Sequence, residues 1–330
     1  MLFTSRPVGD AMATTIWGTS SSWTLTALPL FVWMGEILFR TRLSENLFKG
    51  LSPWMQKLPG GLIHVNVVGC ALFAAISGSS AATVATVGKM SIPELRKRNY
   101  PEKILLGSLA GSGTLGLLIP PSIILIIYGV AVQESIAKLF IAGILPGIMI
   151  ALIFMSYVIF WSLINKKQMP KIIEEYSIFE KIKRSKQLLP VIFLISAVIG
   201  SIYTGIATAT EAASLGVVGA LILSYFQKSL TLETFKTSLL GATKTSCMIA
   251  FILAGSTFLS LAMGFTGLPR NLAMWIQNMD LSPYVLIFVL MIFYIILGMF
   301  LDGISAVVLT MAIIEPMIRQ AGFDMIWFGI

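Results

Sequence analysis

Hydroxyl groups gather where an apolar stretch of this sequence is interrupted. Ser77, Gly78, Ser79 and Ser80 break the apolar run of residues 70–93. Each apolar arm beside the break is shorter than the about 20 residues that span a bilayer. Backbone can leave a helix at membrane depth only where protein or a water-filled cavity satisfies its polar groups. We therefore predict a re-entrant hairpin whose tip offers hydroxyl and carbonyl oxygens to a small cation.

Three further stretches place small, polar or acidic residues inside apolar segments. Residues 111–114 interrupt segment 104–132, residues 204–211 separate two later spans, and residues 301–303 interrupt segment 284–317. Intramembrane ionisable groups are costly and usually functional, so Asp302 is expected to face a cation site at the tip of a second hairpin. The ion-binding candidates are Ser77, Gly78, Ser79, Ser80, Gly111, Ser112, Gly113, Asp302 and Gly303. The candidates for lining a substrate site are Thr114, Ser122, Thr208, Thr210 and Glu211.

Each of these stretches also has a purely structural interpretation. Small residues permit close helix packing, as the GxxxG pair Gly107 and Gly111 suggests. The Asp302 carboxylate caps a half-helix in this reading, a role compatible with cation binding. Glu211 is either part of a discontinuous helix near the site or a solvated cap at a loop. The pair at residues 120–121 kinks its helix, and this fixed break positions Ser122.

The remaining reactive side chains give no sign of enzyme chemistry. His64, the single histidine, is expected to make a structural hydrogen bond rather than to relay protons. Cys70 and Cys247 lie in apolar runs and are expected to be buried, unpaired thiols. No carboxylate cluster suits a metal ion or a hydrolytic site. There is no Walker A sequence, so ATP is not the direct energy source.

Composition indicates a polytopic membrane protein. The chain of 330 residues is 56% hydrophobic and 12% charged, with a mean hydropathy of +0.88. Soluble globular chains are about 25% charged. Expected spans and interfacial segments are residues 23–39, 46–57 (amphipathic), the hairpin 70–93, 104–132, 140–163, 188–203, 212–226, 228–244 (amphipathic), 246–265, 267–282 (interfacial, anchored by Trp275) and the hairpin 284–317.

The distribution of basic residues predicts the orientation of these spans. Loops 40–57, 94–103, 166–187 and 228–244 hold most of the 23 lysine and arginine residues. Cytoplasmic loops carry such an excess, so the first hairpin is expected to open to the cytoplasm and the second to the outside.

Two halves of the chain show a weak similarity that is consistent with an inverted repeat. Pro93, Arg96 and Tyr100 align at a constant offset with Pro316, Arg319 and Phe323, and the two hairpin breaks then fall at equivalent positions. We expect a first repeat over residues 1–187 and a second, incomplete one over 188–330. The alternative is chance similarity between apolar segments.

Several motifs, in order and over nearly the whole chain, resemble the large membrane subunit of tripartite ATP-independent periplasmic (TRAP) transporters. They are GCALFAAISGSSAATVATVGKMSIPELRKRNY, LGSLAGSGTLGLLIPPSIILIIYG, LFIAGILPGIM, YTGIATATEAAS and LGMFLDGISAVVLT. The resemblance implies an all-α fold of the ion-transporter superfamily with two re-entrant hairpins, discontinuous helices and an elevator mechanism. It also implies that the family pattern extends before Met1 and after Ile330.

The same resemblance implies sodium-coupled import of an organic acid across the bacterial inner membrane, with Na+ as the coupling ion and no organic cofactor. The implied partners are a small four-helix membrane subunit and a periplasmic binding protein that delivers the substrate. Candidate substrates are C4-dicarboxylates, sialic acid and 2-oxo acids. The alternative is a standalone ion-coupled carboxylate carrier of the same superfamily. An intramembrane enzyme or a channel fits the sequence less well, since neither a nucleophile–base pair nor a continuous polar span is present.

Overall fold

The computed structural model describes residues 8–40, 43–170, 176–186, 188–267, 271, 274 and 282–330, and every regular element there is helical. The predicted all-α class is therefore confirmed for these residues. The first half contains α1 (Val8–Ser20), η1 (Trp23–Thr26), α2 (Ala27–Phe39), α3 (Leu43–Met55), α4 (Ile63–Ser77), α5 (Ser80–Lys97), α6 (Glu102–Gly113), α7 (Leu115–Leu118), α8 (Ile123–Ala131), α9 (Ile136–Ile164) and η2 (Lys166–Gln168). The second half contains α10 (Ile178–Ser185), α11 (Leu189–Tyr203), α12 (Ala209–Phe226), α13 (Leu232–Thr266), α15 (Pro283–Gly298), α16 (Gly303–Gln320) and α17 (Met325–Gly329).

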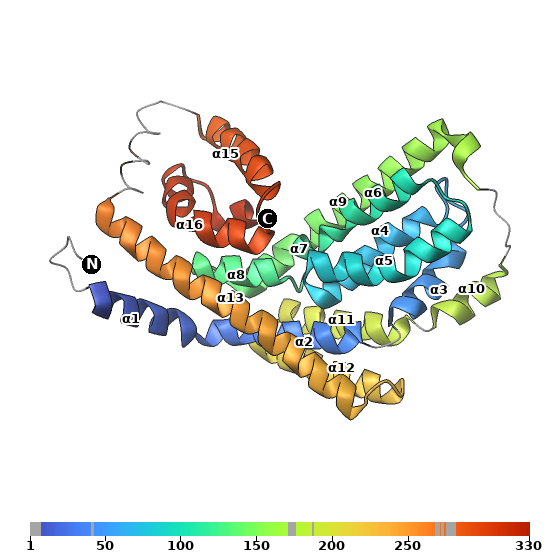
Figure 1. Ribbon diagram of the computed structural model, residues 1–330, viewed down its shortest axis with the longest axis horizontal. Coiled ribbons are helices and arrows are strands. Elements are labelled where there is room, and N and C mark those ends of the chain that lie inside the picture. Colours follow the sequence, from blue (N-terminus) through green and yellow to red (C-terminus); the bar gives the residue numbers. More distant parts are fainter. Residues whose placement is uncertain are drawn as a thin grey trace.

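The helices form three neighbouring groups. Figure 1 shows α13 running diagonally past α1 and α2, and it contacts both; α12 packs on α2, and α11 packs on α12. A second group joins α4, α5 and α6 to α7 and α9. In the third, α16 packs on α8 and α13 and carries α15 and α17 beside it (Figure 1). The helix α8 belongs to both the second and third groups, because it also contacts α7 and α9.

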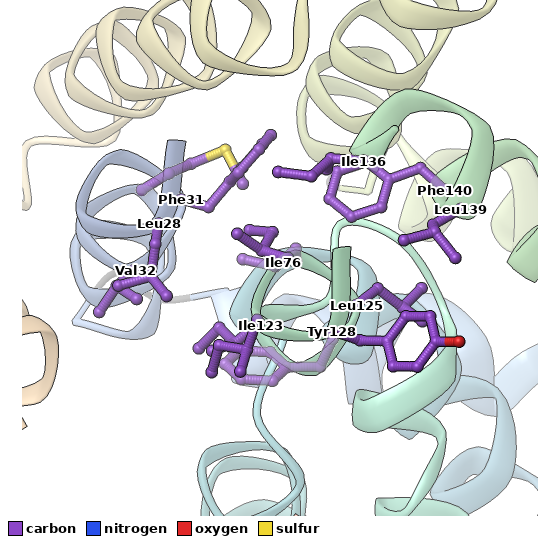
Figure 2. Close-up of a cluster of buried hydrophobic side chains, with 14 of the residues drawn as sticks. Leu28, Phe31, Val32, Ile76, Ile123, Leu125, Tyr128, Ile136, Leu139 and Phe140 are labelled. Atoms are coloured by element: carbon purple, nitrogen blue, oxygen red, sulfur yellow. The ribbon is translucent and has the colours of Figure 1, made fainter. Parts of the chain in front are cut away.

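A buried apolar cluster packs α2, α4, α8 and α9 together and so joins these groups. Figure 2 shows Phe31 of α2, Ile76 of α4, Ile123 and Tyr128 of α8 and Phe140 of α9 converging from four helices. The rings of Phe31 and Phe140 meet edge to face with centroids 5.7 Å apart. Because this cluster lies directly beside the end of α4, it fixes the position of the break at Gly78 relative to α8.

The length and apolarity of the helices match a membrane protein. In the described residues, four helices are long and apolar enough to cross a bilayer, and up to seven spans result if each bent helix pair is one span. The four are α9, α12, α13 and α16. The multi-pass character predicted from composition is thus supported by the fold.

The first of the two breaks expected in segment 104–132 is a one-residue interruption. Gly111, Ser112 and Gly113 are helical, α6 ends at Gly113 and α7 begins at Leu115, and Thr114 between them keeps right-handed helical torsions. Glycine costs about 1 kcal/mol in a helix, but neighbours fill the space beside these residues. A Cβ on Gly111 would touch Phe154, and one on Gly113 would overlap Val84. Close packing thus outweighs helix propensity here.

The second predicted break in this segment is present. Residues 119–122 separate α7 from α8, and the two helical parts are bent by 42°. Proline lacks an amide donor, so the pair at residues 120–121 ends the helix.

Other boundaries differ from the sequence-based expectation. From Leu232 on, the amphipathic stretch 228–244 and the span 246–265 form one continuous helix, α13, of 35 residues. The helix α1 precedes the first predicted span and is bent by 51° from the helix that follows. Cys70 is buried and Cys247 is exposed, so the expectation of two buried thiols was wrong for Cys247. The predicted interfacial segment 267–282, with Trp275, lies mostly outside the described residues.

Candidate functional site

The first hairpin breaks at Gly78. This residue adopts a left-handed conformation (φ 57°, ψ 12°) and ends α4, while Ser79 is extended and caps α5 through its side chain. Left-handed torsions cost little only for glycine. We call residues 77–80 tip one.

Tip one is held by its own hydroxyl groups. The hydroxyls of Ser77 and Thr83 lie 2.9 Å apart. Thr83 donates to the carbonyl of Ser79 at 2.7 Å, and the Ser79 hydroxyl accepts from the Ala82 amide at 3.5 Å. The hydroxyl groups of Ser77 and Ser79 therefore form hydrogen bonds that stabilise tip one itself.

Tip one packs backbone against backbone on the break between α7 and α8. The Ile123 amide donates to the Gly78 carbonyl at 3.3 Å. A Cβ on Gly78 would lie 2.8 Å from the Pro121 carbonyl oxygen, and one on Gly116 would lie 2.9 Å from the Ser79 carbonyl group. Such close approach is available only to glycine, which explains why both residues stand at this contact.

The second hairpin breaks between α15 and α16. The Asp302 carboxylate accepts hydrogen bonds from the amides of Ile304 at 3.1 Å and Ser305 at 3.2 Å. It therefore caps the first turn of α16, as the structural interpretation of this residue predicted. We call residues 301–303 tip two.

One cavity of about 510 Å³ brings the two tips together. Its lining includes Ser77, Gly78, Ser79 and Ser80 of tip one and Asp302 and Gly303 of tip two. Tip two also rests on the break beside α8, because a Cβ on Gly303 would lie 2.9 Å from Ile124 and 3.5 Å from Leu117. Residues more than two hundred positions apart in the sequence thus line one cavity.

The helices α2 and α13 also line this cavity. Glu36 and Thr245 add polar atoms there, beside Val32, Met248 and Ile252. The Glu36 carboxylate forms an ion pair with Arg40, one helical turn away. Sequence reasoning placed Glu36 near a helix end and missed its position in the cavity. The signal that was available is a single carboxylate in an otherwise apolar helix.

The ends of three helices line this cavity and determine its electrostatics. The C-terminus of α4 presents carbonyl groups, whereas the N-termini of α5 and α16 present amides. The first favour a cation and the second an anion. The arrangement is therefore suited to hold a small cation and a carboxylate close to each other.

Two groups of candidates lie away from the cavity lining. Ser112 is buried in α6, where its hydroxyl donates to the Ser108 carbonyl at 2.6 Å, and Gly111, Gly113 and Thr114 share this helical region. Ser122 is buried at the start of α8 and donates to the Leu117 carbonyl at 2.5 Å. Its neighbours Ile123 and Ile124 line the cavity, but Ser122 is not part of the lining.

Thr208, Thr210 and Glu211 lie at the start of α12. Thr208 and Glu211 form a capping box, in which the Glu211 carboxylate accepts from the Thr208 amide at 2.8 Å. The Thr208 hydroxyl accepts from the Glu211 amide at 3.3 Å. Thr210 is buried. None of the three lines the cavity between the tips. Of the two interpretations of Glu211, the geometry favours a helix cap over a position near the site.

Replacing Thr208 by alanine is expected to lower the free energy of unfolding by about 1 kcal/mol, because the cap of α12 is lost. Thr208→Ser keeps the hydroxyl and is expected to behave like the parent protein. Thermal unfolding in detergent measures both. Unchanged thermal stability combined with lost transport in Thr208→Ala would contradict a capping role.

His64 makes the structural hydrogen bond that the sequence predicted. Its Nε2 lies 2.8 Å from the Pro59 carbonyl oxygen, at the base of the first hairpin. The side chain is buried.

Comparison with known proteins places this architecture in context. The model of the family "Tripartite ATP-independent periplasmic transporter, DctM component" matches residues 1–330. The C4-dicarboxylate TRAP transporter large permease protein DctM of Pseudomonas aeruginosa is 32% identical, over 97% of this chain and 74% of the relative. Its namesake in Rhodobacter capsulatus is 31% identical, over 100% and 78%. The 2,3-diketo-L-gulonate TRAP transporter large permease protein YiaN of Escherichia coli is 31% identical, over 97% and 75%.

Proposed function

The chain belongs to the family of DctM components, the large permease subunits of tripartite ATP-independent periplasmic transporters, and from this premise we propose that it imports an organic acid by coupling to a sodium gradient. The observation that carries the proposal is the shared cavity of tips one and two. Secondary transporters bind substrate and ions at such breaks between half-helices.

Sodium binds, in this proposal, at tip one and its surroundings. Hydroxyl and carbonyl oxygens are the ligands that a hard cation prefers. Tip one supplies both, next to the C-terminal carbonyls of α4. Asp302 brings a negative charge to the same cavity and lowers the cost of moving a cation there.

The substrate is proposed to be an organic acid anion that interacts with the N-terminus of α5, because at α16 the amides of Ile304 and Ser305 already donate to the Asp302 carboxylate. The relatives' names include C4-dicarboxylate and 2,3-diketo-L-gulonate, and both are anionic at neutral pH. Free amides at a helix N-terminus bind carboxylates readily. Ser122 is the substrate-lining candidate nearest to this position, because the next two residues of the chain line the cavity.

We further propose an elevator mechanism with two inverted repeats, residues 1–187 and 188–330. The two hairpins share features that support a repeat: each is interrupted by a short non-helical tip, and each second helix contains an interior proline, Pro93 or Pro316. In this mechanism the hairpins and α6–α8 move as one body against α2, α12 and α13.

The proposed partners follow from membership of a tripartite family: a small four-helix membrane subunit and a periplasmic binding protein at the inner membrane. A standalone carrier of the same superfamily is the alternative. The two differ in whether transport needs a delivered substrate.

The test is uptake into proteoliposomes that contain the product of the complete gene. Radiolabelled succinate, 2-oxoglutarate and sialic acid are supplied with and without the small subunit and binding protein from the same operon. We expect uptake only with an inward sodium gradient and both partners. Uptake indifferent to sodium contradicts the coupling, and sodium-driven uptake without the partners supports the standalone carrier.

A further inference from the structure

The short helix α10 presents an apolar strip to the surface. Ile178, Phe179 and Ile182 are 73%, 76% and 50% exposed. Residues 178 and 182 share one helix face, with residue 179 beside it. Ser177 and Glu180 form a capping box that defines the start of the helix. A strip of this kind on a well-formed helix needs an apolar environment to cover it.

Basic side chains accompany this strip. Lys181, Lys183, Arg184 and Lys186 occupy four of the six positions 181–186, with Glu180 before them. Lys183 and Lys186 are exposed, whereas the Arg184 guanidinium stacks on the Tyr176 ring at 4.2 Å. An exposed apolar strip flanked by lysines is the pattern of a helix that lies in the plane of an anionic membrane surface.

The helix α10 is also fixed to α3. The indole of Trp54 donates to the Ser185 hydroxyl at 2.8 Å, and Ser185 donates to the Gly50 carbonyl at 3.3 Å. The Lys181 ammonium lies 5.4 Å above the Trp54 ring. Trp54 itself is 45% exposed, which suits an aromatic residue at the headgroup level.

The orientation of α10 agrees with a position in the interface. Its axis differs by 58° from that of α11, the apolar helix that follows. If α11 crosses the bilayer, α10 turns away from the membrane normal and lies along the surface.

We propose that α10 and the C-terminal end of α3, centred on Trp54, form a binding surface for anionic phospholipid headgroups of the cytoplasmic leaflet. Lys183 and Lys186 contact the phosphates, and Ile178, Phe179 and Ile182 enter the acyl boundary. This surface goes beyond the proposed function, and its cytoplasmic orientation rests on the distribution of lysine and arginine residues among the loops. Because α3 leads directly to the first hairpin, bound lipid holds the start of that hairpin at a fixed depth.

The test is phospholipid binding by the purified, delipidated protein, measured by native mass spectrometry with phosphatidylglycerol and phosphatidylcholine. Lys183→Gln/Lys186→Gln is expected to weaken phosphatidylglycerol binding roughly tenfold to thirtyfold, since each basic side chain near an anionic surface contributes roughly fivefold. Binding of phosphatidylcholine is expected to change little. This readout does not depend on transport, so it stands or falls separately from sodium coupling.

Lys166→Gln/Lys167→Gln is the matched control, because it removes the same charge from the exposed turn η2 in the same connector. It is expected to leave phosphatidylglycerol binding within about twofold. Equal losses in both double variants would show diffuse charge attraction and overturn the proposal. The proposal would also be overturned if Lys183→Gln/Lys186→Gln left lipid binding unchanged but lost the co-purified small subunit. This face would then be a protein interface.

Discussion

Gly78→Ala is expected to reduce sodium-dependent uptake to about a tenth or less of the parent value. A left-handed conformation costs a residue with a Cβ about 1 to 2 kcal/mol. The new methyl group would also lie 2.8 Å from the Pro121 carbonyl oxygen and 3.0 Å from the Ile123 amide nitrogen. Both are backbone atoms, so tip one must move away from α8 and lose the hydrogen bond between Ile123 and Gly78. Uptake assays in proteoliposomes measure the effect.

Gly107→Ala is the control for this substitution. Gly107 lies in the neighbouring helix α6 and has open space where a Cβ would be placed. Alanine also favours the helix, so uptake and melting temperature are expected to equal or exceed those of the parent. Sodium-dependent uptake that survives in Gly78→Ala would show that the contact between tip one and α8 is not needed for transport.

Asp302→Asn is expected to lower sodium-dependent uptake at least tenfold. This factor corresponds to a loss of about 1.4 kcal/mol in the free energy of cation binding when the negative charge is removed. Asparagine caps a helix about as well as aspartate, so the start of α16 should persist and the melting temperature should change little. Asp302→Ala removes the cap as well, and its unfolding free energy is expected to fall by about 1 kcal/mol more. Sodium titrations of uptake and thermal unfolding separate the two contributions.

Asp324→Asn provides the matched control. Asp324 caps α17 by accepting from the Trp327 amide at 2.9 Å, and it does not line the cavity between the tips. It is expected to transport like the parent protein. If Asp302→Asn also keeps the parent's sodium dependence, Asp302 is a helix cap alone.

The sequence predicted those features that depend on local chemistry. The break at Gly78 and the cap at Asp302 were readable because a glycine or an aspartate interrupts a long apolar run. The break beside Ser122 was readable from two adjacent prolines. In each case one residue type has a direct backbone effect.

Other features depend on packing between distant segments and were not readable. Gly111 and Gly113 look like a break, yet the side chains of Phe154 and Val84 pack beside them, both glycines are helical, and the interruption is confined to Thr114. Glu36 reaches the cavity only because α2 packs beside tip one. The single carboxylate in an apolar helix was a local signal, but it does not show which distant residues lie beside it.

The continuous helix α13 has a further consequence, for the bilayer itself. A helix of 35 residues is about 52 Å long, whereas the hydrocarbon core is about 30 Å thick. Its apolar half and its lysine-bearing half form one rod, so neither can reorient alone. Hydrophobic mismatch is then relieved by tilting the whole rod. Because α13 packs on α1, α2 and α16, a change in its tilt displaces its contacts with all three helices together.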